Sequence, residues 1–233
     1  MAAHSKVLSL LTAAAVVGSI VFASQSALVA ASTGDASGFS LVSVLPATGD
    51  TWIRINTQAN YGDWSTLEAG ATTVRDTERV LIKFDLSALP SSATILSADL
   101  HVWYERCGSL VYCNDMTVAL HRVTEPWEEM TATGGDLWDA IDSMPYALQL
   151  VETDEDIWTI WDAQALVEQW HSGDLPNNGL ALLAVPGISE NYKQFAAREK
   201  GDGWAARLVV TWEADPSQID RLFLPRLLVS SNR

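Results

Sequence analysis

The chain has 233 residues and a formal net charge of −15, with 14 Lys and Arg against 29 Asp and Glu. This acidity argues against a nucleic-acid-binding protein, which needs a basic face to neutralise phosphates, and against docking on anionic lipid. A hydrophobic content of 48% excludes a chain that is disordered throughout. Ten residues are Trp, and all of them lie between Trp52 and Trp212, so the indoles belong to the middle of the chain.

The N-terminal residues indicate an export signal. His4 and Lys6 precede an apolar run at residues 7–23, and small residues follow it, which is the pattern of a cleaved signal peptide. An uncleaved anchor is the alternative, but the run is about 17 residues long, near the lower limit for a spanning helix. We therefore predict a signal peptide over residues 1–31, a linker over residues 32–43, and a secreted or cell-surface protein with no membrane span in the mature chain.

From residue 44 to residue 213 the apolar side chains mostly recur at every second position, which predicts half-buried β-strands. In chain order, the clearest predicted strands lie at residues 79–86, 96–105, 116–120, 180–185 and 208–212. The run at 180–185 is apolar throughout, as in a central strand. Many short strands separated by turns are typical of a jelly-roll β-sandwich of two antiparallel sheets, and we assign residues 44–213 to one such domain.

One segment of this domain departs from the strand pattern. Leu166, Val167 and Trp170 recur at helical spacing, and Gly173 is a suitable stop. The pattern predicts a single short helix over residues 162–171, which closes one end of the sandwich.

The chain has two cysteines, Cys107 and Cys113, with five residues between them. In an oxidising compartment this spacing predicts a structural disulfide across a tight loop. A metal site would need more ligands than the pair offers, and a redox-active pair would have the C-x-x-C spacing.

The segment at residues 214–233 follows the last predicted strand and turns apolar and basic. Pro225 and the short length exclude a membrane span. Two interpretations of this tail stay open: a frayed terminus or added edge strand, and a short attachment or sorting tail.

Within the domain, short motifs follow one another in a definite order. They include Asp50-Thr-Trp-Ile, Asn60-Tyr-Gly, Arg79-Val-Leu-Ile-Lys-Phe-Asp-Leu, Ala93-Thr-Ile-Leu-Ser-Ala-Asp-Leu, His121-Arg-Val-Thr-Glu-Pro-Trp-Glu-Glu, Trp161-Asp-Ala-Gln-Ala-Leu-Val-Glu-Gln-Trp, Asn178-Gly-Leu and Phe195-Ala-Ala-Arg-Glu. In this order they resemble the DNRLRE domain, which is grouped with carbohydrate-binding module family 96, over residues 48–213. The resemblance implies a jelly-roll β-sandwich on a secreted or surface protein, with a non-catalytic role and a polysaccharide ligand, alginate being one ligand class of the family.

The chain departs from the family pattern at two positions. Gln164 stands where the family usually has a Thr that would cap the helix, so we expect the cap to be weakened or to move to Asp162. Ala197 stands where the family often has Ser. In addition, the acidic chain would repel a polyanion such as alginate unless its cations cluster locally.

The sequence contains no motif of a metalloprotease, serine hydrolase, phosphate-binding loop or EF-hand. Adjacent acids such as Glu128 and Glu129 do not by themselves supply two carboxylates held about 5–9.5 Å apart across a cleft, as glycoside hydrolysis requires. Glu128 belongs to the pattern of the resembled family and is interpreted as structural. We therefore expect no enzymatic activity.

The tryptophans divide into expected core residues and expected binding platforms. An exposed indole can stack on the apolar face of a sugar ring and loses little entropy on binding. The expected core residues are Trp127, Trp161, Trp170 and Trp212. The candidate platforms are Trp103, which points away from its buried strand neighbours, and Trp64 and Trp204, which lie in loops.

Three cationic side chains are candidate partners for the hydroxyls or acidic groups of a glycan: Arg79, Lys83 and Arg198. Arg79 and Lys83 share one face of a predicted strand, which favours a local basic patch. The alternative, that these charges are ordinary solvated neighbours of Asp85, stays open.

No cofactor is required for such a role, but a structural Ca²⁺ between loops is common in exported jelly rolls and takes carboxylate and amide oxygens. The candidate ligands are Asp50, Asn60, Asp63, Glu199 and Asp202.

The sequence thus predicts a secreted, non-catalytic carbohydrate-binding module whose partner is a polysaccharide or cell-surface glycan. The alternative is a structural or adhesion domain of the cell surface that binds a protein or envelope partner. No oligomeric state is predicted.

Overall fold

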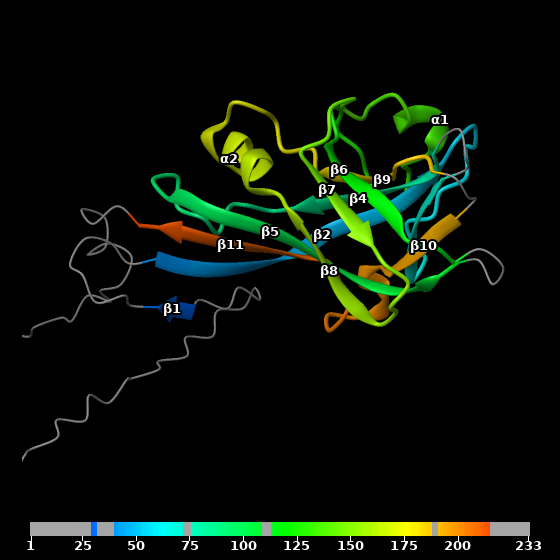
Figure 1. The fold of residues 1–233 in the computed structure, drawn as a ribbon. Helices are drawn as coiled ribbons and strands as arrows, with labels where there is room; N and C mark the ends of the chain where they lie inside the picture. Colours follow the sequence, from blue (N-terminus) through cyan, green and yellow to red (C-terminus); the bar gives the residue numbers. More distant parts are fainter. Residues whose placement is uncertain (1–28, 32–39, 72–75, 109–112, 188–190, 215–233) are drawn as a thin grey trace, which may run out of the picture.

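The computed structural model describes residues 29–31, 40–71, 76–108, 113–187 and 191–214 (Figure 1). The tail predicted at 214–233 lies outside the described residues apart from its first residue, and so does the predicted signal peptide apart from its last three. Among the described residues, no helix is long and apolar enough to cross a membrane.

The described chain is all-β, and every strand pairing in it is antiparallel. The elements in chain order are β1 (Val29–Ala31), β2 (Ser40–Arg54), β3 (Thr66–Ala71), β4 (Asp76–Phe84), β5 (Thr94–Cys107), β6 (Met116–Arg122), α1 (Gly134–Leu137), β7 (Ala147–Val151), β8 (Ile157–Asp162), α2 (Gln164–Ser172), β9 (Leu180–Ala184), β10 (Asn191–Ala196), η1 (Arg198–Lys200) and β11 (Arg207–Glu213). This confirms the expected all-β class and the expected strands.

A ring of hydrogen-bonded strands organises the fold. The ring runs β2–β11–β5–β10–β3–β4, and it closes because β2 pairs with β11 along its first half and with β4 along its second half. Outside the ring, β8 pairs with β5, while β9, β6 and β7 extend outward in turn from β4 (Figure 1). The predicted central strand is β9, which lies between β4 and β6.

The apolar residues form two cores. The larger one fills the space between the strands and includes Trp52, Trp161, Trp170 and Trp212. The smaller one lies on the other side of β4, where Leu81 packs with Trp127 and with residues of the segment from Val123 to Ile141. The four tryptophans predicted for the core are therefore buried, and β4 is buried on both faces at Leu81, where the sequence pattern predicted one exposed face.

The helix α2 forms where the sequence predicts it and packs beside β5 (Figure 1). Its buried side chains are Leu166, Val167 and Trp170, and it ends at Gly173, whose φ of 82° is in the left-handed region. At its start the backbone N–H of Gln164 donates to Asp162 Oδ1 at 2.9 Å. The N-cap residue is Ala163, which makes no side-chain cap bond, so the expected weakening of the cap is confirmed, and Asp162 supplies an acceptor one residue before the N-cap.

The single helical turn α1 was not predicted, because Thr133-Gly-Gly-Asp has the composition of a turn. Thr133 caps it by accepting a hydrogen bond from the backbone N–H of Asp136 at 3.3 Å. Gly134 is required by close packing, since a Cβ there would lie 1.8 Å from the carbonyl oxygen of Arg54.

Two boundary features bear on the sequence predictions. β2 already begins at Ser40, inside the predicted linker, because Leu41 and Ser43 are buried against β11. A disulfide joins Cys107 at the end of β5 to Cys113, as predicted, with Cα atoms 5.7 Å apart.

Candidate functional site

Two strands and a loop bring three tryptophans into one row on the outer face of the fold. On β5 the even-numbered residues of the range 100–104 are buried, so His101 and Trp103 point away from the core. In the antiparallel register Trp103 lies opposite Trp158 of β8. Trp204, in the loop that leads into β11, contacts Trp103 with its ring. The row Trp204–Trp103–Trp158 therefore spans three elements that are far apart in the sequence.

The rings in this row are in direct contact. The ring centroids of Trp103 and Trp204 are 4.5 Å apart with planes at 54°, and those of Trp103 and Trp158 are 5.4 Å apart with planes at 74°. The guanidinium carbon of Arg207 lies 4.1 Å from the ring centroid of Trp158, and the ring of His101 is 6.3 Å from the same indole. We call these five residues the aromatic face: His101, Trp103, Trp158, Trp204 and Arg207.

The aromatic face is open to solvent. Trp204 is 41% exposed, the other members are half-buried, and Ile160, which lies opposite His101 in the β5–β8 register, is exposed as well. Arg207 forms no ion pair with any residue that the structure describes. The face thus presents indole surface together with a guanidinium group that no ion pair within the described part of the chain neutralises.

His101 is the titratable aromatic residue of this face. Burial lowers the pKa of His101, the neighbouring Arg207 lowers it further, and Asp99 opposes both effects. The imidazole therefore stays neutral to a lower pH than an ordinary histidine, and its Nδ1 has no hydrogen-bond partner among the described residues.

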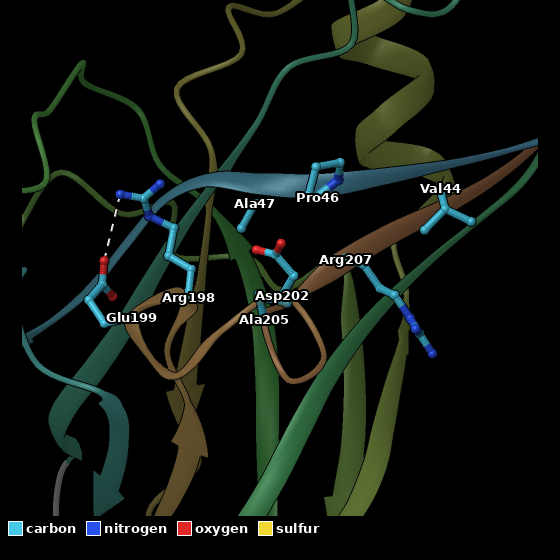
Figure 2. A pocket seen from close by; sticks show the side chains of 9 residues that line it. Val44, Pro46, Ala47, Arg198, Glu199, Asp202, Ala205 and Arg207 are labelled. Carbon is cyan, nitrogen blue, oxygen red and sulfur yellow. Dashed lines mark ion pairs between the residues drawn. The ribbon is translucent and has the colours of Figure 1, made fainter. Parts of the chain in front are cut away.

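A pocket of about 320 Å³ adjoins the aromatic face, and the two share Arg207 (Figure 2). Its walls come from β2, η1 and the loop before β11, through the residues Val44, Pro46, Ala47, Arg198, Glu199, Asp202, Ala205, Ala206 and Arg207. Figure 2 shows Arg198 and Glu199 at one end, Arg207 toward the other, and Asp202 between them. This volume is at the lower end of the range of about 300–1,000 Å³ that is usual for small-ligand pockets.

Trp64 belongs to a separate aromatic group. It is 46% exposed, and its ring makes edge contacts with Tyr61 at 5.2 Å and Trp52 at 5.6 Å. Tyr61 in turn stacks on the buried Trp52 at 3.8 Å. The structure therefore brings together two of the three candidate platforms, Trp103 and Trp204, and leaves Trp64 apart from them.

Arg79 and Lys83 lie on the face of β4 that the smaller core covers. The guanidinium carbon of Arg79 is 3.7 Å from the ring centroid of Trp138, and the side chain forms an ion pair with Asp76. Lys83 Nζ lies 4.5 Å from the ring centroid of Trp127 and donates to the carbonyl oxygen of the same residue. Both cations are therefore engaged by neighbouring side chains, and neither belongs to the aromatic face.

Arg198, which lines the pocket, also contacts a group of acids. Its Nε and Nη2 donate to the two carboxylate oxygens of Glu129 at 3.0 and 2.8 Å, and its backbone N–H donates to Asp50 Oδ2 at 3.0 Å. Burial raises the pKa of Asp50 to about 7; the hydrogen bond from the Arg198 backbone opposes this, and the charges of Glu199 and Glu129 raise it further. We call Asp50, Glu129 and Glu199 the carboxylate cluster.

Sequence reasoning missed four residues of these sites: His101, Trp158, Arg207 and Glu129. Trp158 was overlooked, although Trp161 was assigned to the core and residues three apart on a strand point to opposite faces. Glu129 was noted in the sequence only as the neighbour of Glu128, and the Glu128 side chain is 86% exposed and approaches Lys83 Nζ at 3.8 Å. No local signal distinguishes the two adjacent glutamates.

Comparison with known proteins places the chain in a family. No curated protein matches the chain. A family model, that of carbohydrate-binding module family 96, matches residues 42–212, which is well over half of the chain and includes both the aromatic face and the carboxylate cluster. Proteins of such families are typically non-catalytic. The chain belongs to carbohydrate-binding module family 96.

Proposed function

We propose that this chain is a secreted, non-catalytic carbohydrate-binding module with the two-sheet arrangement of a jelly-roll β-sandwich, and that it binds a polysaccharide through the aromatic face. The observation that carries the proposal is the solvent-accessible row Trp204–Trp103–Trp158. Indoles offer a large apolar area at low entropic cost, and the apolar face of a pyranose ring complements such a surface.

A row of aromatic residues suits a polymer better than a single sugar. The three rings belong to one continuous contact series, so successive units of a glycan chain can each rest on an indole. Arg207, whose guanidinium carbon lies 4.1 Å from the Trp158 ring centroid, supplies hydrogen-bond donors that orient the sugar hydroxyls. The adjoining pocket gives room for a branch or a neighbouring unit.

The charge around the aromatic face favours a neutral polysaccharide. Asp99 of β5 and Asp162 of β8 lie opposite each other on this side of the sheet, two positions along from His101. The whole chain also carries a net charge of −15. A polyanion such as alginate would meet this negative field with Arg207 as the one cation of the aromatic face, so we place neutral glycans ahead of acidic ones.

A panel of immobilised neutral and acidic polysaccharides tests the proposal, with retention measured for the wild-type protein and for Trp204→Ala and Trp64→Ala. Both tryptophans are exposed to a similar extent, so Trp64→Ala is a matched control from outside the aromatic face. We expect retention on at least one neutral glycan, weakened in Trp204→Ala and unchanged in Trp64→Ala. Retention on no glycan, or loss in Trp64→Ala alone, would overturn the proposal.

An adhesion role is the second candidate, and the strand β7 favours it. β7 ends the pairing order of the sheet, and its Leu148 and Leu150 are exposed. Exposed apolar side chains on an edge strand are typical of a docking surface for a partner protein. Leu148→Lys should then abolish capture of the protein on the cell envelope while its retention on glycans persists. Removal of residues 220–233 tests the tail separately: if the truncated protein is retained at the cell surface as well as the full chain, the tail has no attachment role.

A further inference from the structure

The carboxylate cluster gathers three acids from distant parts of the chain. Asp50 comes from β2, Glu129 from the loop between β6 and α1, and Glu199 from η1, and one carboxylate oxygen from each lies within 4.8 Å of the others. Asp50 is 1% exposed, Glu129 is half-buried and Glu199 is exposed to solvent. Among the described residues, Arg198 is the only cation that pairs with this group, so three carboxyl groups face one guanidinium group.

Backbone contacts hold the cluster in place. Asn60 Nδ2 donates to the carbonyl oxygens of Glu129 at 2.7 Å and Ala132 at 2.9 Å, which fixes the loop that carries Glu129. Gly62 lets the two loops approach, since a Cβ there would lie 2.3 Å from the Glu129 carbonyl oxygen. The backbone N–H of Asp50 donates to Glu129 Oε1 at 2.8 Å. The acids are therefore positioned by the fold and do not meet by chance at a mobile surface.

One oxygen of the cluster is left without a partner. Arg198 occupies both oxygens of Glu129 through its side chain and Oδ2 of Asp50 through its backbone N–H. Asp50 Oδ1 is buried and has no hydrogen-bond partner among the described residues. A buried carboxylate oxygen without a donor is costly, and a bound cation would offset that cost.

We propose that the carboxylate cluster binds one divalent cation, with Ca²⁺ preferred, through Asp50 Oδ1 and the carboxylates of Glu129 and Glu199. Oxygens that share one Ca²⁺ at about 2.3–2.6 Å lie no more than about 5 Å apart, and the cluster meets this limit. The ligands are all oxygens, as a hard cation requires, and the flexible coordination of Ca²⁺ suits three carboxylates from separate segments better than the octahedron of Mg²⁺.

The pocket supplies the remaining coordination and the route of entry. Glu199 belongs both to the cluster and to the pocket wall (Figure 2). Ca²⁺ takes about six to eight oxygens, so water from the pocket completes the shell. Arg198 competes with the ion for Glu129, which places the affinity in the range of about 10⁻⁴–10⁻³ M that extracellular modules use.

This site differs from the set of ligands expected from the sequence. Asp50 and Glu199 belong to it. Asn60 does not bind the ion but holds the Glu129 loop through its side-chain amide. Asp63 and Asp202 lie outside the cluster.

The test is calorimetric titration and thermal unfolding of the mature protein with CaCl₂ and, separately, MgCl₂, after treatment with a chelator. We expect one Ca²⁺ per chain, a higher melting temperature in millimolar CaCl₂, and a weaker response to MgCl₂. Glu199→Gln should weaken Ca²⁺ binding at least about tenfold, since a charged ligand contributes on the order of 1.4 kcal/mol or more. Glu128→Gln makes the same charge change one residue from Glu129 and should leave binding unaltered.

A third variant separates a cation site from a closed ion-pair network. Arg198→Met removes the competing guanidinium, so it should lower the stability of the metal-free protein and strengthen Ca²⁺ binding, with CaCl₂ restoring the melting temperature. If the cluster is only the counter-charge of Arg198, this variant is destabilised and CaCl₂ does not rescue it. That result, or an equal Ca²⁺ response in wild type and Glu199→Gln, would overturn the proposal, whatever the glycan panel shows.

Discussion

Trp103 of β5 lies directly opposite Trp158 of β8 in the antiparallel register, with ring centroids 5.4 Å apart and ring planes at 74°. This edge-to-face contact is one of the favoured geometries for aromatic pairs. Trp103 also contacts Trp204 at 4.5 Å, so it is the central member of the row and the residue on which the orientation of both neighbours depends.

Trp103→Ala should therefore weaken glycan binding more than Trp204→Ala. Loss of the central indole removes a stacking surface, and it also removes the ring that both Trp158 and Trp204 contact. We expect a loss of about 2 kcal/mol, roughly 30-fold in affinity, for Trp103→Ala, and about 1 kcal/mol for Trp204→Ala. Affinity electrophoresis in gels that contain the retained glycan measures both, with circular dichroism to verify the fold. Equal binding by Trp103→Ala and wild type would contradict the row as the binding surface.

The aromatic face was partly predictable from the sequence. Alternation along β5 placed Trp103 on the outer surface, because burial of Leu100 and Val102 fixes the direction of the residue between them. Its contact with Trp204 was not predictable, since it depends on a loop whose course is set by the β11–β5 pairing. Short-range pattern thus predicts which way a side chain points but not which side chains meet there.

Arg79 and Lys83 of β4 do not form the open basic patch that the sequence favoured, because a distant segment covers them. Alternation placed Arg79 and Lys83 on the face opposite the main core, and the structure agrees. The smaller core built from the segment between β6 and β7 then covers that face, and Trp138 and Trp127 engage the two cations. The alternation of apolar and polar residues along a strand does not show whether a distant segment covers its outer face.

His101 should make the stability of the protein depend on pH in the acidic range. Its pKa is lowered in the folded chain, because of burial first and Arg207 second. Below the ordinary histidine pKa of about 6.5, the unfolded chain therefore binds a proton that folded His101 resists, and the free energy of unfolding falls as pH falls through that value. Above it, this contribution to stability is fully present.

Urea unfolding of wild type and His101→Gln between neutral pH and pH about 5 measures this effect. The unfolding free energy of the variant should decrease less than that of the wild type when the pH is lowered. His121, whose pKa burial also lowers, remains in both proteins, and so do the buried acids, so the difference between the two curves reports His101 alone. Parallel curves would show that His101 does not titrate in this way.

The disulfide between Cys107 and Cys113 should contribute moderately to stability. It closes a short loop, and loop-closure entropy for such a bridge amounts to about 2 kcal/mol. The end of β5 is also held without it, since the backbone N–H of Cys107 donates to Glu155 Oε1 at 2.9 Å and that of Gly108 donates to the carbonyl oxygen of Tyr192 at 2.9 Å. Cys107→Ser with Cys113→Ser should therefore remain folded but unfold at a lower urea concentration; an unchanged midpoint would contradict this estimate.

Gly62→Ala tests the link between the loop packing and the carboxylate cluster. The new methyl group would lie 2.3 Å from the backbone oxygen of Glu129, which cannot move aside like a flexible side chain. Overpacking of this kind costs about 1–3 kcal/mol, and the displacement of the loop carries the Glu129 carboxylate away from Asp50. We expect a lower urea midpoint together with a weaker stabilisation by CaCl₂. Gly203→Ala is the matched control, because a Cβ there meets nothing within 4 Å; it should keep both the stability and the response to Ca²⁺. If Gly62→Ala lost stability but kept the full Ca²⁺ response, Glu129 would be removed from the ligand set while Asp50 and Glu199 remained in it.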